Sequence, residues 1–324
     1  MISSRGIPLV SILIPSYNAD RYIKEAIDSA LMQDYPNFEI LVIDDGSTDR
    51  TWEILQGYTD PRLHMTRREN RGITSTRNEL FQQAKGDYFT LLDSDDIYMQ
   101  GKLSKEVAFL EMHHEYALVY CRLKYFFDGA PDTYYRHRFK LYSGEEVFPE
   151  LLKQQFITNT AIMFRREVYD KLGGYNPATG MVEDWEYFLR MLRNGYKIAY
   201  LDEDLVRYRL RWDSNTNFAR QVTLKDSQVK IFENLRDQMS AEDRKKWNID
   251  HWLADRKKNY AIAFLSNGQK KEAWNVYGEI KEKISLKNRV LIVMMMAVPS
   301  LLLRFAIEQA WNLRKKRLFI PMAE

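Results

Sequence analysis

The first half of the chain alternates short, continuous apolar runs with segments whose apolar residues recur at helical spacing. A continuous apolar run predicts a strand buried on both faces of a sheet, and apolar residues three or four positions apart predict an amphipathic helix. The predicted strands are residues 9–14, 38–43, 63–66 and 87–92, and the predicted helices are residues 20–33, 51–58 and 74–84. Strands that alternate with helices form βαβ units, so we expect an α/β fold on a mostly parallel sheet.

The second half begins in the same style and then becomes wholly helical. Residues 155–164 are predicted to run into an apolar strand, and residues 205–211 to form the last strand. Between them lies a helix with an apolar stripe that starts at Trp185. From about residue 217 the pattern is that of long amphipathic helices. Residues 252–284 resemble one helical hairpin of the tetratricopeptide type, and a single copy does not predict a repeat array.

Length and pattern together predict two domains. The 324 residues suffice for two domains or for one large domain with an appendage, and 45% hydrophobic with 29% charged residues is ordinary for a globular protein. We expect the following division: an α/β domain at residues 1–212, with halves at 8–100 and 101–212, and an all-α C-terminal extension at 213–324.

Charge, cysteine content and motifs narrow the classes of function. A net charge of +3 is too small to indicate nucleic acid as a partner. Cys121 is the only cysteine, which excludes an intramolecular disulfide and agrees with a reducing cytoplasm. The N-terminal sequence has no apolar core of signal-peptide length, so we expect a cytoplasmic location. No turn carries a Gly-x-Gly-x-x-Gly or P-loop motif, which argues against those two nucleotide sites.

The apolar run from Phe89 ends abruptly in three acids, Asp93, Asp95 and Asp96. They follow a predicted strand at its carboxyl end, where open α/β sheets place their ligand sites. Burying three like charges together costs several kcal/mol unless a cation compensates, and carboxylates suit Mg²⁺ or Mn²⁺ shared with substrate phosphates. An exposed acidic turn with Asp96 capping the next helix is the alternative, and these residues alone leave both open.

Two further strand exits carry polar or aromatic residues. Tyr17 follows the first strand and offers an aromatic face for a base, and Asp45 follows the second and can accept from a ring N–H or a ribose hydroxyl. Each has a plain structural alternative, packing for Tyr17 and a helix-capping turn for Asp45. Acids at two parallel strand ends with a tyrosine at a third favour a common site.

These motifs together resemble those of family 2 glycosyltransferases. The matching segments are Pro15-Ser16-Tyr17-Asn18, Asp44-Asp45-Gly46-Ser47-Thr48-Asp49, Asn70-Arg71-Gly72, Arg77-Asn78 and Asp93-Ser94-Asp95-Asp96, within a similarity over roughly residues 8–211. The resemblance implies an inverting, metal-dependent enzyme with the GT-A fold, which is a Rossmann-like, mixed but mostly parallel sheet flanked by helices. It implies a nucleotide-diphospho-sugar donor, commonly a UDP-sugar, bound by the first half.

The resemblance also implies roles for individual residues. The base would lie against Pro15, Tyr17 and Asp45, beside Asn18. The Asp-x-Asp element of Asp93, Ser94 and Asp95 would hold the ribose and a Mn²⁺ or Mg²⁺ ion, with Asp93 and Asp95 as the metal ligands. Arg77 would lie near the nucleotide.

Two residues of the second half complete the expected site. Glu183 and Asp184 begin the helix with the apolar stripe, where acids also occur for capping and dipole reasons alone. The resemblance makes Asp184 the catalytic base, across the donor from Asp95. Relatives often carry the motif Tyr-Arg-x-His at the position of residues 208–211, and the last residue of that motif is Arg211 in this chain. An arginine that could bind phosphate therefore replaces a histidine. Alternatively, Arg211 lies with other arginines on a solvated strand face.

The C-terminal segment suggests a partner. Residues 290–303 are apolar but shorter than the roughly 20 residues that cross a bilayer, and residues 304–317 are basic. This pairing fits an anchor on the anionic inner face of a membrane. The alternative is a core-packing helix or one that forms an oligomer.

The expected function is therefore transfer of a sugar from a nucleotide-diphospho-sugar, a UDP-sugar, to a saccharide or lipid-linked saccharide in bacterial cell-surface polysaccharide assembly. A catalytically inactive nucleotide-sugar-binding protein is one alternative. A sugar nucleotidyltransferase is the other, although it needs a Gly-rich basic loop that this chain lacks after its first predicted strand.

Overall fold

A computed structural model describes residues 6–137, 140–211, 220–299, 302–307, 309 and 319–322 of the chain. The chain divides into two compact units. Unit 1 is Met1–Pro177, Tyr187–Arg211 and Pro321–Glu324, and unit 2 is Ala178–Glu186 and Trp212–Ile320.

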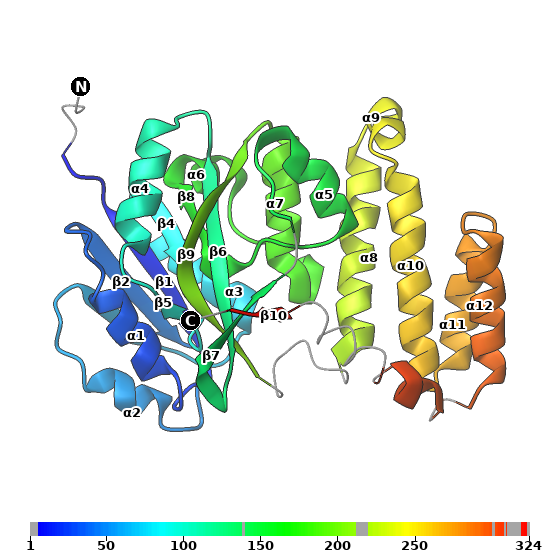
Figure 1. Ribbon diagram of the computed structural model, residues 1–324, viewed down its shortest axis with the longest axis horizontal. Helices are drawn as coiled ribbons and strands as arrows, with labels where there is room; N and C mark the ends of the chain where they lie inside the picture. The colour runs from blue at the N-terminus through cyan, green and yellow to red at the C-terminus, as the bar shows by residue number, and fades with distance from the viewer. Residues whose placement is uncertain are drawn as a thin grey trace. The chain divides into compact units, whose positions relative to one another are not determined.

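Unit 1 is built on a mixed sheet (Figure 1). Its strands are β1 (Val10–Ser16), β2 (Phe38–Asp44), β3 (Leu63–Arg67), β4 (Tyr88–Leu91), β5 (Ile97–Tyr98), β6 (Leu118–Phe127), β7 (Ala130–His137), β8 (Ile162–Arg165) and β9 (Ile198–Leu210). The order is β7-β6-β8-β4-β1-β2-β3, and β9 pairs with both β6 and β5. Strand β1 is parallel to its two neighbours, β2 and β4, so these three strands end at one edge of the sheet.

The helices of unit 1 follow the sequence pattern closely. They are α1 (Ile23–Leu31), α2 (Thr51–Gln56), α3 (Ile73–Gln83), α4 (Lys102–Met112), α5 (Val147–Lys153), α6 (Arg166–Leu172) and most of α7 (Glu183–Arg193), with short 3-10 turns η1 (Gly144–Glu146) and η2 (Asn159–Ala161). A third 3-10 turn, η3 (Pro177–Val182), belongs to unit 2 apart from its first residue. The four strands and three helices predicted in the first half are confirmed, with ends shifted by a few residues. The β6–β7 hairpin was not predicted, and β9 begins at Ile198 rather than at residue 205.

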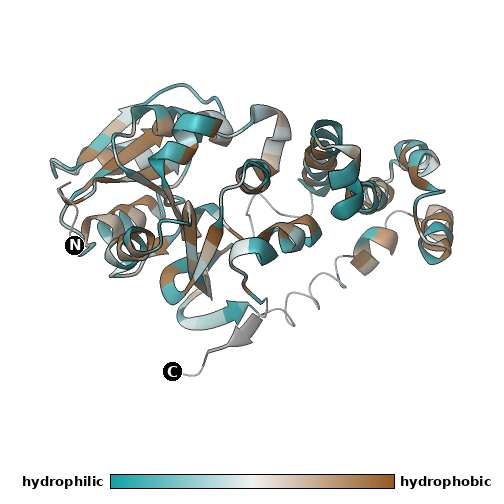
Figure 2. Cartoon of the chain, turned by 90° about the horizontal axis from the view of Figure 1, so that it is seen from above, coloured by the Kyte–Doolittle hydropathy of each residue, from teal (hydrophilic) through white to brown (hydrophobic). Residues whose placement is uncertain are grey.

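A buried aromatic cluster holds α3 against the sheet. Phe81 of α3 lies 5.9 Å from Phe89 of β4 and 5.8 Å from Phe164 of β8, between ring centroids, and all three are fully buried. Burying an aromatic side chain of this size contributes roughly 2–3 kcal/mol. Figure 2 shows hydrophobic residues, in brown, on the strands of this sheet. The packing fixes the position of Arg77, one turn earlier on α3.

Unit 2 is mainly helical in the described residues. It contains the start of α7 and the helices α8 (Gln221–Gln238), α9 (Ala241–Lys246), α10 (Ile249–Ser266), α11 (Lys270–Ile280) and α12 (Leu286–Ala297). Helices α8 and α10 lie side by side, and Trp185 packs on Phe232 of α8 with 5.8 Å between ring centroids (Figure 1). The hairpin predicted at residues 252–284 is confirmed as α10 and α11, although α11 ends earlier, at Ile280. A short strand, β10 (Phe319–Pro321), follows near the C-terminus.

Candidate active site

The exits of β1 and β2 are joined into one platform. Beyond β1, the amide of Asn18 donates to the hydroxyl of Ser47 at 2.9 Å, and the side-chain oxygen of Asn18 accepts from the amide of Thr48 at 2.8 Å. Asn18 has a φ of +48°, a left-handed conformation that asparagine tolerates better than most residues. Pro15 is buried in β1, and Tyr17 is 50% exposed. The predicted base-binding residues Pro15, Tyr17 and Asn18 therefore share an edge, with the Tyr17 ring open to a ligand.

Asp45 organises the loop that follows β3. Its carboxylate accepts from the amides of Arg71 at 2.9 Å and Gly72 at 2.8 Å and pairs with Arg68 at 2.7 Å. The next residue, Gly46, has a φ of +77°, and a Cβ there would lie 2.8 Å from the backbone nitrogen of Asn70. Only glycine fits so close an approach, which explains the Asp-Gly pair. The predicted contact of Asp45 with the base stays a prediction.

Two of the three acids after β4 pair with an arginine, and the third accepts from a backbone amide. Asp93 Oδ1 lies 2.6 Å from Nη2 of Arg77, and Asp95 Oδ2 lies 3.2 Å from Nη1 of Arg211. Asp96 is buried and accepts from the amide of Arg209 at 2.9 Å. The structure thus brings Arg77 to Asp93 and Arg211 to Asp95, with Ser94 half-buried between the two acids in the sequence, and their roles toward a ligand stay predictions.

The electrostatics of the acids follow from burial and crowding. Burial raises the pKa of Asp95, the charge of Asp93 raises it further, and Arg211 and Arg209 oppose the shift. Burial raises the pKa of Asp96 well above its usual range, and the charges of Asp95 and Asp93 add to that effect. Two guanidinium groups therefore compensate the cluster only in part, and a further cation would be stabilised there.

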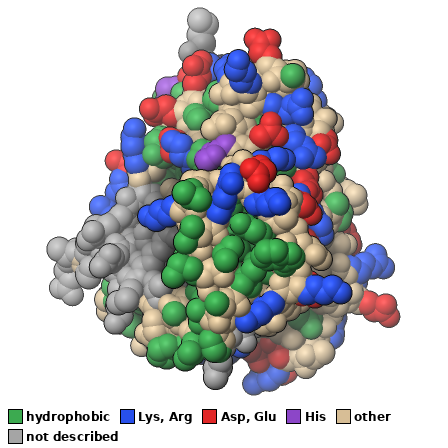
Figure 3. Space-filling model, turned by 90° about the vertical axis from the view of Figure 1, so that its right-hand side faces the viewer, with side chains coloured by type: hydrophobic (Ala, Val, Ile, Leu, Met, Phe, Trp, Pro, Cys, Tyr) green, Lys and Arg blue, Asp and Glu red, His purple; other side chains and the backbone are tan. Residues whose placement is uncertain are grey.

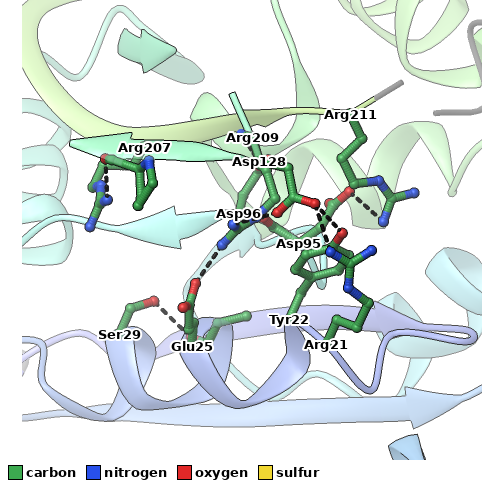
Figure 4. Close-up of polar contacts among 12 residues, drawn as sticks. Arg21, Tyr22, Glu25, Ser29, Asp95, Asp96, Asp128, Arg207, Arg209 and Arg211 are labelled. Atoms are coloured by element: carbon green, nitrogen blue, oxygen red, sulfur yellow. Dashed lines mark hydrogen bonds and ion pairs between the residues drawn. The ribbon is translucent and has the colours of Figure 1, made fainter. Parts of the chain in front are cut away.

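Arg209 is the residue of this site that the sequence pattern did not single out. Its Nε donates to the carbonyl of Asp95 at 2.9 Å, its guanidinium pairs with Glu25 and Asp128, and its Cζ lies 4.7 Å from the ring centroid of Tyr22 (Figure 4). Its side chain is only 7% exposed, so the alternative of a solvated arginine face is wrong for this residue. The one feature of the sequence that could have pointed to Arg209 is its position in residues 208–211, the segment that resembles Tyr-Arg-x-His.

The chemistry of the acids fits a divalent ion that is shared with a ligand. In the residues that the structure describes, no group of three His, Cys, Asp or Glu side chains lies close enough to hold a metal alone. Mg²⁺ and Mn²⁺ often take one or two carboxylates from the protein and the rest from phosphates and water. Asp93 and Asp95, crowded and only partly neutralised, supply that kind of donor pair.

Asp184 belongs to unit 2, whereas Asp93 and Asp95 belong to unit 1. It is the second residue of α7, and its Oδ1 accepts from the amide of Trp185 at 2.7 Å. Just before it, the hydroxyl of Ser227 on α8 accepts from the amide of Met181 at 3.3 Å. Packing of Trp185 on α8 and this bond hold the start of α7, and the role of Asp184 as the base stays a prediction.

A family model for glycosyl transferase family 2 matches residues 11–173, about half of the chain and the whole of the strand-exit site after β1, β2 and β4. The chain belongs to glycosyl transferase family 2. It is therefore a glycosyltransferase, and the sugar nucleotidyltransferase alternative is set aside.

Curated relatives of this family 2 enzyme extend the match. It is 33% identical over 207 residues to a putative teichuronic acid biosynthesis glycosyltransferase, TuaG, of Bacillus subtilis. The aligned region covers 63% of this chain and 79% of the relative. It is 29% identical over 242 residues to a putative glycosyltransferase, EpsE, of the same organism, covering 71% and 82% of the two chains.

Solved structures confirm the GT-A fold. S. aureus TarS 1–349, in complex with UDP-GlcNAc, has a TM-score of 0.64 at 19% identity and covers 94% of this chain and 91% of its own. A mannosyltransferase of Pyrobaculum calidifontis, in complex with GDP-Man and Mn²⁺, has a TM-score of 0.57 at 18% identity, over 94% and 88%. The mixed sheet with flanking helices and the helical C-terminal region agree with the predicted fold class.

Proposed function

We propose that this glycosyltransferase moves a sugar, with inversion, from a UDP-sugar to a saccharide or lipid-linked saccharide during assembly of a cell-surface polysaccharide. The observation that carries the proposal is the pairing of Asp93 with Arg77 and of Asp95 with Arg211 beside the exits of β1 and β2. The names of TuaG and the UDP-GlcNAc complex of TarS support the polysaccharide and the nucleotide.

The residues of unit 1 would bind and orient the donor. Tyr17 would stack on the base, and Arg77 and Arg211 would contact the diphosphate, because a guanidinium donates two parallel hydrogen bonds to phosphate oxygens. Asp93 and Asp95 would hold Mn²⁺ or Mg²⁺. The ion, when bound, would neutralise the negative charge that grows on the departing nucleoside diphosphate.

Asp184 would hold the proton that the acceptor loses. Its carboxylate takes the hydroxyl proton while the acceptor oxygen bonds to the anomeric carbon, and the bond from that carbon to the diphosphate oxygen breaks on the opposite side. A single displacement of this kind inverts the anomeric configuration. An α-linked donor therefore yields a β-linked product.

A screen of nucleotide sugars by thermal unfolding tests the proposal. Binding to the folded state raises the midpoint temperature, so a UDP-sugar with Mn²⁺ should give a larger shift than the ion or the nucleotide alone. The Tyr17→Ala variant should lose most of the shift. A GDP-sugar that stabilises the protein where UDP-sugars do not would assign a different base, and no shift with any nucleotide sugar would contradict the donor proposal.

Exposed apolar residues of unit 2 support a membrane surface as a partner of this protein. No helix in the described part of the chain is long and apolar enough to span a bilayer. On α12, Val290, Leu291 and Met294 are 49%, 44% and 64% exposed, while Ile292 is fully buried. Figure 3 shows hydrophobic side chains gathered on this side of the chain, with Lys and Arg side chains near them. Residues 308 and 310–317 of the predicted basic stretch lie outside the described residues.

An exposed apolar face on a helix with Lys287 and Arg289 fits the surface of an anionic leaflet. We expect Met294→Glu to reduce cosedimentation with phosphatidylglycerol vesicles several-fold. Met112→Glu, at a methionine that is 71% exposed on α4, is the matched control and should bind like the wild type. Unchanged vesicle binding by Met294→Glu together with loss of a dimer would make the face an oligomer contact instead. Point changes are preferable to truncation because Ile292 belongs to a buried cluster.

A further inference from the structure

Unit 1 contains a cavity outside the donor residues described above. It has a volume of about 390 Å³, within the usual range for small-molecule pockets. Strands β6, β7 and β9 line it together with the segment between α5 and β8. The β6–β7 hairpin, which the sequence pattern did not predict, supplies much of its wall.

Aromatic rings form one side of the cavity. Tyr120 of β6 lies 5.3 Å from Tyr200 of β9 and 6.0 Å from Phe156, between ring centroids. Tyr120 is held in place because its hydroxyl donates to the carbonyl of Tyr142 at 2.9 Å. Phe156 and Tyr200 are only partly buried, so ring surface remains open to a ligand. Aromatic faces of this kind pack against the C–H faces of a pyranose ring.

The polar side of the cavity is balanced in charge. Arg122 Nε donates to the hydroxyl of Tyr200 at 2.9 Å, and that hydroxyl donates to Asp202 at 2.6 Å, while Arg122 also pairs with Asp202. Arg136 pairs with Asp204 at 2.6 Å. Each arginine thus already has a carboxylate partner, which disfavours a phosphate here and leaves hydrogen-bonding groups suited to hydroxyls.

Thr158 adds a polar group that a ligand would satisfy. Thr158 lines the cavity, and its hydroxyl is buried behind the cavity surface, with no hydrogen-bond partner among the described residues. A buried hydroxyl without a partner costs about 1–3 kcal/mol. A ligand hydroxyl in the cavity would remove that cost.

One residue of the cavity, Tyr125, connects it to the strand that carries Arg209. Tyr125, which lines it, packs on Tyr208 with 5.4 Å between ring centroids, and the next residue along β9 is Arg209, which binds Asp95 and Asp96. Burial raises the pKa of Tyr125, and the charge of Asp96 raises it further. A group bound in the cavity would therefore lie next to the strand that holds the acids.

We infer that this cavity is an acceptor subsite that binds one pyranose ring of the saccharide that receives the sugar. The inference rests on the proposed function, since it names the place of the acceptor in the same reaction. It assigns specificity for the acceptor to the β6–β7 hairpin and to Phe156, apart from the donor residues after β1, β2 and β4.

Direct binding tests the inference without knowledge of the natural acceptor. The probe is a panel of neutral and uronic-acid pyranose mono- and disaccharides, measured by saturation-transfer NMR and titration, and we expect dissociation constants of roughly millimolar order for at least one member. Phe156→Ala should weaken binding about 10-fold or more. Thr158→Val, which keeps the shape and removes the hydroxyl, should weaken it about 2- to 10-fold. Phe109→Ala, at a partly buried phenylalanine on α4 outside the cavity, is the control and should bind normally.

UDP binding by calorimetry in the same variants separates this inference from the proposed function. UDP affinity should stay within about two-fold of wild type in Phe156→Ala and Thr158→Val. Saccharide binding that both variants retain, or no saccharide binding by the wild type, overturns the acceptor subsite and leaves the donor proposal intact. Loss of UDP binding in these variants would place the donor in the cavity and also overturn the inference. Failure of the wild type to bind any nucleotide, with saccharide binding intact, contradicts the proposed donor and leaves the cavity as a saccharide site without its role as acceptor subsite.

Discussion

Arg211 and Asp95 form an ion pair at the end of β9, with 3.2 Å between Nη1 and Oδ2. The arginine opposes the rise in pKa that burial and Asp93 cause at Asp95. The pair is partly exposed, with 22% and 27% of the two side chains accessible. When a diphosphate binds together with a cation, we expect the diphosphate to replace Asp95 as the partner of Arg211 and the cation to replace Arg211 as the partner of Asp95.

Loss of the guanidinium at this position should weaken diphosphate binding. For Arg211→Gln we expect the dissociation constant of UDP to rise about 10- to 100-fold, the value of one or two charge-assisted hydrogen bonds, while uridine binding is unchanged. Arg207→Gln is the matched control, because Arg207 lies on the same strand but donates to the carbonyl of Pro131. Equal weakening of uridine and UDP would show that Arg211 holds the fold of the site and does not contact the diphosphate.

Removal of divalent metal should abolish transfer, because the crowded acids after β4 are incompletely neutralised by arginine. We expect activity to disappear in EDTA and to return with Mn²⁺ or Mg²⁺. Asp95→Asn, which is nearly isosteric, should lose the nucleotide-dependent binding of Mn²⁺ measured by paramagnetic resonance, while its unfolding midpoint stays near that of the wild type. Full turnover by protein verified to be metal-free would sink the prediction.

Lys102 and Glu106 form a fully buried ion pair on α4, with 2.6 Å between Nζ and Oε1. Burial raises the pKa of Glu106 from 4.5 to about 7, against the attraction of Lys102. The folded state thus holds a proton more tightly than the unfolded state does. The contribution of Glu106 to the free energy of unfolding therefore falls as pH rises from about 4.5 to about 7.

Breaking this pair should destabilise the protein in a pH-dependent way. For Lys102→Met we expect a loss of about 3–5 kcal/mol at pH 8, where the unpaired Glu106 must stay charged or take up a proton at a free-energy cost, and a smaller loss at pH 5, where protonation costs little. The double variant Lys102→Met with Glu106→Leu should lie close to the wild type at both pH values. Urea unfolding at the two pH values measures both, and an equal loss at pH 5 and pH 8 would contradict the assignment of the pH dependence to Glu106.

Much of the donor half could be predicted because its signals are local. The strand before Asp93 and the strand before Asp45 are continuous apolar runs, and parallel pairing of β4, β1 and β2 brings their exits together. The grouping of Tyr17, Asp45 and the acids follows from that rule alone. Arg77 came from family resemblance, and its contact with Asp93 depends on how α3 packs on the sheet.

What the sequence could not reveal depends on long-range pairing. Arg209 meets Asp96 and Glu25 only because β9 pairs with β5 and β6, and these partners are 113 and 184 residues away along the chain. The β6–β7 hairpin was missed because Arg122 and Lys124 interrupt the apolar pattern after Cys121. The prediction for Asp184 is limited in another way, because an acid at a helix N-terminus has the same sequence pattern whether it caps the helix or acts as a catalytic base.

The role of Asp184 can be separated from that of the donor site by two measurements. A base that contacts the acceptor hydroxyl does not contact the nucleotide, so Asp184→Asn should leave donor affinity within a few-fold by calorimetry. It should reduce transfer by roughly 10²–10⁴, the usual range for a positioned proton acceptor. Asp95→Asn should instead lose metal-dependent donor binding.

The Asp184→Asn variant should fold normally, because asparagine keeps the size and most of the capping ability of aspartate at the start of α7. Any residual product from an α-linked donor should still be β-linked, since inversion follows from in-line geometry and not from the base. Transfer at the wild-type rate would move the base elsewhere, with Glu183, buried beside it, as the next residue to test. Loss of donor binding in Asp184→Asn equal to that in Asp95→Asn would place Asp184 in the nucleotide pocket, and its assignment to the acceptor side would then be wrong.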